Sequence, residues 1–210
     1  MRKITANYIF PVSSAPLKNG IIVLDDKNKI IDIIDTKNKF KEIENLEFYS
    51  GVIVPGFVDA FTLLSYSNFL GKDFTDCISG DFYSNLSAKI SIIKADLQSV
   101  QRAINHLEAY GTKAALDLYP HPDCSPQKMK SKIYFSDSNR NLSLGLDEQE
   151  ENSNSFTLIN RYTLKENSIL PKTSNHICIG TGSLGTHQKL SVFEEMKWIQ
   201  ARFSILLPGK

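Results

Sequence analysis

The amino-acid sequence predicts an α/β protein with two parts, a small β-sheet over residues 1–54 and a mainly parallel sheet with helices over residues 55–210. In the first part, short runs rich in Ile, Val, Phe and Tyr are separated by residues that favour tight turns. In the second part, strand-like runs alternate with stretches of helical periodicity, which is typical of βα units. The acidic, polar stretch 143–155 lacks a hydrophobic period and is predicted to be a linker.

The first part is predicted to hold four strands. Asn19-Gly20 and the polar run 25–28 supply residues that tolerate positive φ, so they are expected to form the turns. Such short connections favour consecutive hairpins in a small antiparallel sheet. The predicted strands cover residues 4–12, 20–24, 29–34 and 47–54.

Two helices are predicted in the second part. The first follows Asp96, which can cap its N-terminus, and ends near Gly111. The second begins with a capping box in which Ser191 and Glu194 are expected to bond to each other's backbone. The apolar stripe of the first helix consists of Leu97, Val100, Ile104 and Leu107. The predicted strands of this part cover residues 113–119, 130–135 and 175–181.

Composition indicates a soluble globular protein. Hydrophobic residues make up 41% and charged residues 22%, with a net charge of +1, so no nucleic-acid or membrane partner is expected. No apolar run reaches the roughly 18 to 20 residues of a membrane helix, and the N-terminal residues lack a secretion-signal pattern, which predicts a cytoplasmic location. Cys77, Cys124 and Cys178 are widely spaced and odd in number, which predicts reduced thiols.

Three motifs carry a resemblance to a known family. Residues 55–63 read PGFVDAFTL, residues 179–184 read IGTGSL before the last predicted helix, and residues 110–117 read YGTKAALD, the weakest of the three. In this order they resemble the amidohydrolase superfamily, especially its deaminase and chlorohydrolase branch. The resemblance implies that the N-terminal sheet is half of a composite sandwich domain. It also implies that the motifs are the first, eighth and second strands of a metal-bearing (β/α)8 barrel.

The residues that the resemblance assigns to metal binding are missing. The family's chemistry uses a divalent metal to generate hydroxide, which attacks a carbon bearing nitrogen or chlorine. Its ligands would include two histidines two residues apart on the first strand, where their side chains share a face, and an aspartate on the eighth strand. Phe61, Leu63 and Gly182 occupy those positions. We therefore expect neither metal ligands nor a cofactor there.

The length of the chain predicts a shortened barrel. A (β/α)8 barrel takes about 250 residues, and a chain of 210 residues leaves too few after position 54 for eight βα units. We expect an internally shortened barrel whose first and last parts are joined. The strands that complete the sandwich after the barrel are also missing, so the N-terminal sheet is expected to expose an apolar face. This predicts a homo-oligomer or a protein partner.

A few polar residues remain as weak catalytic candidates. Asp117 and His121 lie at the C-terminal end of the predicted second barrel strand, where such folds place active sites. His187 follows the last predicted strand and could face the same rim, although loop histidines are usually only polar surface residues. Ser183 with His187 lacks a nucleophile elbow and an orienting acid. His106 is expected at the surface, opposite the apolar stripe of its helix.

The leading hypothesis is an amidohydrolase-like pseudoenzyme with a role in binding or self-association. An alternative is an active hydrolase of carbon–nitrogen bonds other than peptide bonds. Its non-standard site, holding a divalent metal such as zinc, would use His121, His187 and Asp117 and be completed by oligomerisation. A third hypothesis is a remnant without a selected function.

Overall fold

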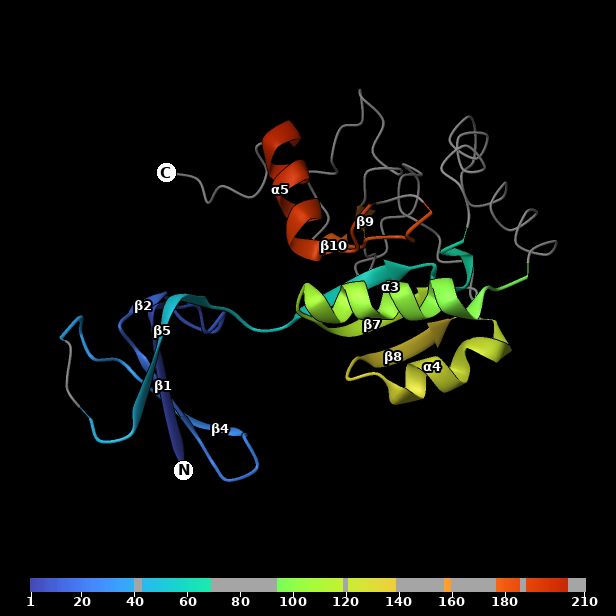
Figure 1. Ribbon diagram of the computed structural model, residues 1–210. Coiled ribbons are helices and arrows are strands. Elements are labelled where there is room, and N and C mark those ends of the chain that lie inside the picture. Colours follow the sequence, from blue (N-terminus) through green and yellow to red (C-terminus); the bar gives the residue numbers. More distant parts are fainter. Residues whose placement is uncertain are drawn as a thin grey trace. The chain divides into compact units, whose positions relative to one another are not determined.

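The computed structural model describes residues 1–39, 43–68, 94–118, 121–138, 157–159, 177–185 and 188–203. The chain divides into two compact units, Met1–Pro55 and Gly56–Lys210 (Figure 1). No helix among the described residues is long and apolar enough to cross a membrane. The predicted linker at 143–155 lies outside the described residues.

The first unit is a five-stranded sheet. Its strands are β1 (Arg2–Ile9), β2 (Leu17–Lys18), β3 (Ile21–Leu24), β4 (Ile30–Ile34) and β5 (Leu46–Ile53). The order is β2-β1-β3-β4, with β5 paired to β1. The pairs of β1 with β2, of β1 with β3 and of β3 with β4 are antiparallel, as the turn residues predicted.

The pairing of β5 differs from the predicted run of hairpins. β5 lies parallel to β1, with Ile4 opposite Glu47 and Ile9 opposite Ile53. β4 pairs with β3 and β5 pairs with β1, so the connection between β4 and β5 joins strands that are not neighbours in the sheet. A parallel pair requires such a crossover connection, and a periodicity of two does not reveal it.

An apolar cluster connects the strands of this sheet. Ile4, Ile22 and Ile33 are directly opposite one another on β1, β3 and β4. Cross-strand apolar pairs of this kind are the main stabilising contacts of a sheet. The cluster also contains Ile9, Leu17, Leu24 and Ile53. Other large apolar side chains of this unit are exposed, among them Tyr8, Ile30, Ile31, Phe48, Tyr49 and Val52.

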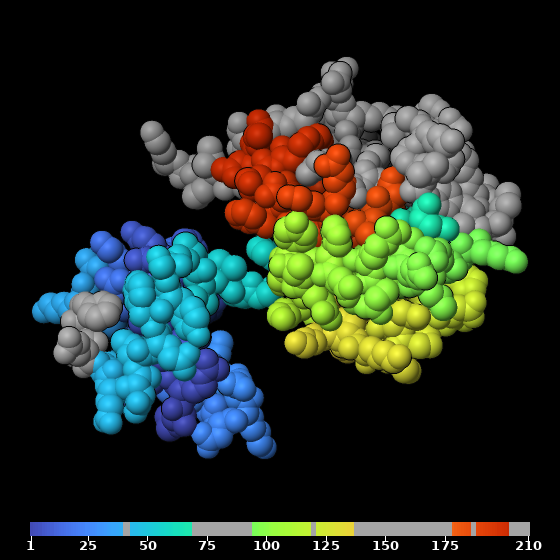
Figure 2. All heavy atoms as spheres, viewed as in Figure 1, coloured from blue at the N-terminus to red at the C-terminus, as the bar shows by residue number. Residues whose placement is uncertain are grey.

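The second unit contains a parallel three-stranded sheet. Strands β6 (Phe57–Thr62), β7 (Thr112–Leu118) and β8 (Tyr134–Ser138) lie in sequence order. Helix α3 (Leu97–Ala109) connects β6 to β7, and helix α4 (Ser125–Lys130) connects β7 to β8. Figure 2 shows the atoms of α3 (green) directly against those of segment 121–138 (yellow). This arrangement is that of successive βα units.

Helix α3 follows its predicted pattern closely. Asp96 accepts hydrogen bonds from the backbone N–H groups of Gln98 and Ser99, and Gly111 follows the helix with a φ of 82°. Leu97 in the first turn is 40% exposed, contrary to the predicted stripe, whereas Val100, Ile104 and Leu107 are buried. They form the main core of the second unit together with residues of β7 and the segments around it, namely Leu64, Ala103, Ala115, Cys124, Ile133 and Leu190.

The strand predicted over 130–135 is wrong in its first half. Residues 125–130 form α4, and β8 begins only at Tyr134. Pro126 lies in the first turn of α4, where the missing N–H of proline costs no helical hydrogen bond. The short polar helix was missed because it carries no apolar stripe of its own.

The C-terminal segment returns to the first strand of the parallel sheet. Strands β9 (Thr157–Ile159) and β10 (Ile177–Ile179) pair in parallel, and Gly182 forms a parallel bridge with Thr62 of β6. Helix α5 (Val192–Phe203) follows, and Ser191 Oγ accepts a hydrogen bond from Glu194 N–H at 3.3 Å, as the capping box predicted. The predicted α/β fold, a small β-sheet followed by a parallel sheet with helices, is confirmed.

Substitution of Gly180 by alanine should destabilise the second unit strongly. An added Cβ would lie 2.3 Å from Phe61 Cβ and 2.7 Å from Phe61 N. Because backbone atoms of β6 form part of this contact, we expect a loss of about 3 kcal/mol or more in the free energy of unfolding. Urea unfolding measures it, and Phe61→Ala should not rescue the variant. A loss below about 0.5 kcal/mol would contradict the close approach of Gly180 to β6.

Candidate functional site

The structure brings together the three positions that the resemblance assigns to metal ligands. Leu63 N–H donates to the carbonyl oxygen of Gly182 at 2.8 Å, and Gly182 N–H donates to that of Phe61 at 2.9 Å. Phe61 and Leu63 are each 1% exposed. Gly182 has a φ of 77°, a left-handed conformation that favours glycine, and it forms a parallel bridge with Thr62. The residues present do not fit a metal ion, because none has a side-chain lone pair.

Next to these positions, Asp59 joins β6 to the C-terminal segment. Its side chain is fully buried and accepts hydrogen bonds from Phe61 N–H at 3.2 Å and Thr181 N–H at 3.0 Å. The Thr181 hydroxyl donates to its other oxygen at 2.5 Å. Sequence reasoning missed Asp59, although a single acidic residue within an apolar strand was a usable signal. The carboxyl group connects segments that are 122 residues apart.

Burial raises the pKa of Asp59 from 3.8 to about 7. Loss of hydration disfavours the carboxylate, and the nearby carboxylate of Glu195, a buried residue of α5, acts in the same direction. The hydrogen bonds from Thr181 and Phe61 lower the pKa but do not outweigh burial. The folded state therefore holds a proton that the unfolded chain releases between pH 4 and pH 7.

Stability should fall as the pH rises through this range. A raised carboxyl pKa contributes stability that is fully present below the unfolded value of 3.8 and is lost as the pH passes about 7. We expect a fall on the order of 2 to 4 kcal/mol in the free energy of unfolding. Asp59→Asn lacks a titrating proton, so its curve should be flatter. Urea unfolding from pH 5 to pH 8 tests this, and parallel curves for the two proteins would contradict it.

Asp117 and Lys128 form a buried ion pair. The side chain of Asp117 is fully buried at the end of β7, and that of Lys128 on α4 is 7% exposed. Lys128 Nζ lies 2.6 Å from Asp117 Oδ2, and Asp117 Oδ1 accepts a hydrogen bond from Leu64 N–H at 3.1 Å. The Nζ atom also lies 5.7 Å from the ring centre of Phe135. Asp117, one of the weak catalytic candidates, thus neutralises a buried ammonium group.

Replacement of Lys128 by methionine should destabilise the protein. The variant leaves the carboxylate of Asp117 buried without its opposite charge, which costs about 3 to 5 kcal/mol. Asp117→Asn combined with Lys128→Met removes both charges and keeps an acceptor for Leu64 N–H, so it should recover most of the loss. Chemical unfolding at pH 7 measures all three proteins. Equal stability of the single and double variants would show that the charges are not coupled.

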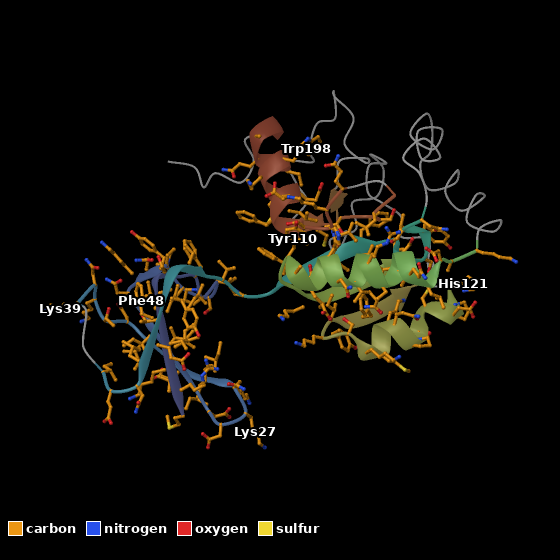
Figure 3. The ribbon with its side chains drawn as sticks, in the orientation of Figure 1. Lys27, Lys39, Phe48, Tyr110, His121 and Trp198 are labelled. Carbon is orange, nitrogen blue, oxygen red and sulfur yellow. The ribbon has the colours of Figure 1, made fainter. Side chains whose placement is uncertain are left out.

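His121 caps the one-turn 3-10 helix Pro122–Cys124, which precedes α4 at the C-terminal edge of the sheet (Figure 3). Its Nδ1 accepts a hydrogen bond from Asp123 N–H at 3.3 Å and lies 3.5 Å from Asp123 Oδ2. The backbone N–H of His121 donates a hydrogen bond to Ser65 Oγ at 2.9 Å. Ser65 Oγ also lies 3.4 Å from the sulfur of Cys124, and burial raises the pKa of that thiol. The backbone and the ring of His121 are thus both engaged in hydrogen bonds within the chain.

Of the histidines His106 and His187, only His106 lies among the described residues. His106 was expected at the surface but is half-buried, with its ring centre 6.2 Å from that of Tyr110. Tyr110 lies four residues after His106, on the same side of the helix, and its ring covers part of the imidazole. His187 lies outside the described residues, so its grouping with His121 and Asp117 stays a prediction. Ser183 is buried, and its Oγ accepts a hydrogen bond from Gly185 N–H.

Comparison with solved structures finds similar folds. No protein-family model and no curated protein sequence matches the chain. An aminofutalosine deaminase from Helicobacter pylori has 16% identity and a TM-score of 0.49, over 85% of this chain and 43% of that one. A guanine deaminase from C. acetobutylicum has 12% identity and a TM-score of 0.45, over 97% of this chain and 51% of that one. An ochratoxinase from A. niger has 16% identity and a TM-score of 0.43, over 65% of this chain and 30% of that one.

This chain therefore spans about half of those structures or less. What the chain can do chemically depends on its own residues, described above.

Proposed function

We propose that this chain is a catalytically silent amidohydrolase-like protein that acts by binding, either to itself or to another protein. The observation that carries the proposal is the contact of Phe61, Leu63 and Gly182 at the start of the parallel sheet. The zinc ion of such a hydrolase site is bound by side-chain nitrogen, oxygen or sulfur atoms. Two buried apolar side chains and a glycine provide none of these, and they fill the space that imidazole rings would need.

The acidic residues beside these positions also support the proposal. Asp59 accepts three hydrogen bonds from β6 and Thr181, and Asp117 is paired with Lys128. If either carboxylate turned toward a metal, buried donors or a buried ammonium group would lose their partner, at a cost of several kcal/mol. Both residues are therefore better suited to holding the fold than to catalysis.

The surface of the first unit favours a binding role. Tyr8, Phe48, Tyr49 and Val52 are between 42% and 55% exposed on the adjacent strands β1 and β5. Exposed apolar side chains on neighbouring strands are typical of interaction surfaces. The sheet thus offers area for association that needs no metal and no reaction.

The purified protein should contain no stoichiometric metal. After expression in medium supplemented with zinc, iron and manganese, elemental analysis should find less than about 0.1 metal ion per chain, because the ligand positions lack donor atoms. Assays with cyclic amidines, amides and aminopurines should show no turnover above buffer. One metal ion per chain together with turnover would overturn the proposal. In that case His121→Ala with His187→Ala would show whether those histidines bind the metal.

A further inference from the structure

Strand β4 combines an apolar sequence with an exposed position at the margin of the first sheet (Figure 1). Ile30, Ile31 and Ile34 are 54%, 52% and 39% exposed, whereas Ile33 packs against the core of the sheet. Isoleucine is a strong strand former, and three such side chains in water are unfavourable unless another surface covers them. β4 is therefore a candidate for contact with a further strand.

One edge of β4 is open among the residues that the structure describes. β4 pairs with β3, and no described strand pairs with its other edge. The N–H group of Ile33 donates to its neighbour Asp32 Oδ1 at 2.8 Å, so it is not part of the ladder with β3. Charged side chains at such edges limit uncontrolled pairing with other chains. Asp32 thus covers a donor that an incoming strand would use.

The sequence of β4 is complementary to itself in the antiparallel direction. Residues 30–34 read IIDII, which is the same in both directions. If two copies pair about a two-fold axis at Asp32, Ile30 lies opposite Ile34 of the second copy and Ile31 lies opposite its Ile33. The same register places Lys29 opposite Asp35 of the second copy. A two-fold axis repeats each contact, so two opposite-charge pairs flank the strands.

We propose that a second copy of this chain docks on the open edge of β4, antiparallel and centred on Asp32, so that the two sheets become continuous. This names the partner in the binding role proposed above and rests on that role. Apolar pairs and the Lys29–Asp35 pairs favour the contact, and the two Asp32 carboxylates, directly opposite each other, weaken it. A two-fold contact closes after two copies, so a reversible dimer is expected and not an open filament.

Sedimentation equilibrium tests the geometry through charge reversal. Dimers of the wild-type protein should become detectable as its concentration is raised to about 500 µM, as expected for a weak interface. Lys29→Asp and Asp35→Lys should each raise the dissociation constant about tenfold or more, because like charges then face each other twice. An equimolar mixture of these two variants should restore dimers, since every charge in the mixed pair faces its opposite. Lys18→Asp on β2 is the control with the same change of charge and should dimerise normally.

A second variant tests the centre of the contact. Asp32→Asn keeps an acceptor for Ile33 N–H and removes the repulsion at the axis, so it should lower the dissociation constant about fivefold. Circular dichroism verifies that each variant is folded. A wild-type monomer at all concentrations, a mixture that stays monomeric, or assembly beyond dimers would overturn the proposal. These outcomes are independent of metal content and turnover, which decide catalytic silence.

Discussion

The contact between Asp59 and Thr181 is the constraint on which the second unit depends. It holds the C-terminal segment against β6 and thereby sets the place of Gly182, whose backbone bonds to Phe61 and Leu63. The interaction is polar and fully buried, so its partners must be accurately placed or the cost of desolvation is not recovered. The apolar residues at the ligand positions are thus packed within a framework held by one carboxyl group.

Two buried carboxyl groups of the second unit have their charge compensated by different means. In a metal-dependent hydrolase, buried carboxylates are compensated by the cation that they bind. Here the ammonium group of Lys128 has that role for Asp117, and a proton has it for Asp59 at acidic pH. Both carboxyl groups are thus stabilised by contacts within the chain.

Local features of the structure could be predicted from the sequence, and long-range ones could not. The cap at Asp96, the buried stripe of α3 and the start of α5 follow from residues a few positions apart. The parallel pairing of β5 and the ion pair of Lys128 depend on segments that meet only in the folded chain. Asp59 is intermediate, since its position in an apolar strand was visible in the sequence but its partner Thr181 was not.

The separation of Asp59 from Thr181 also bears on how the chain folds during synthesis. The five strands of the first unit lie within residues 1–55 and can pair as soon as those residues leave the ribosome. The second unit must wait, because β6 is an early strand whose buried partner lies 122 residues later. Contacts of such long range form slowly, and β6 keeps an open, apolar edge until they do. During synthesis, residues 57–63 are therefore the segment that a chaperone would most need to shield from wrong contacts.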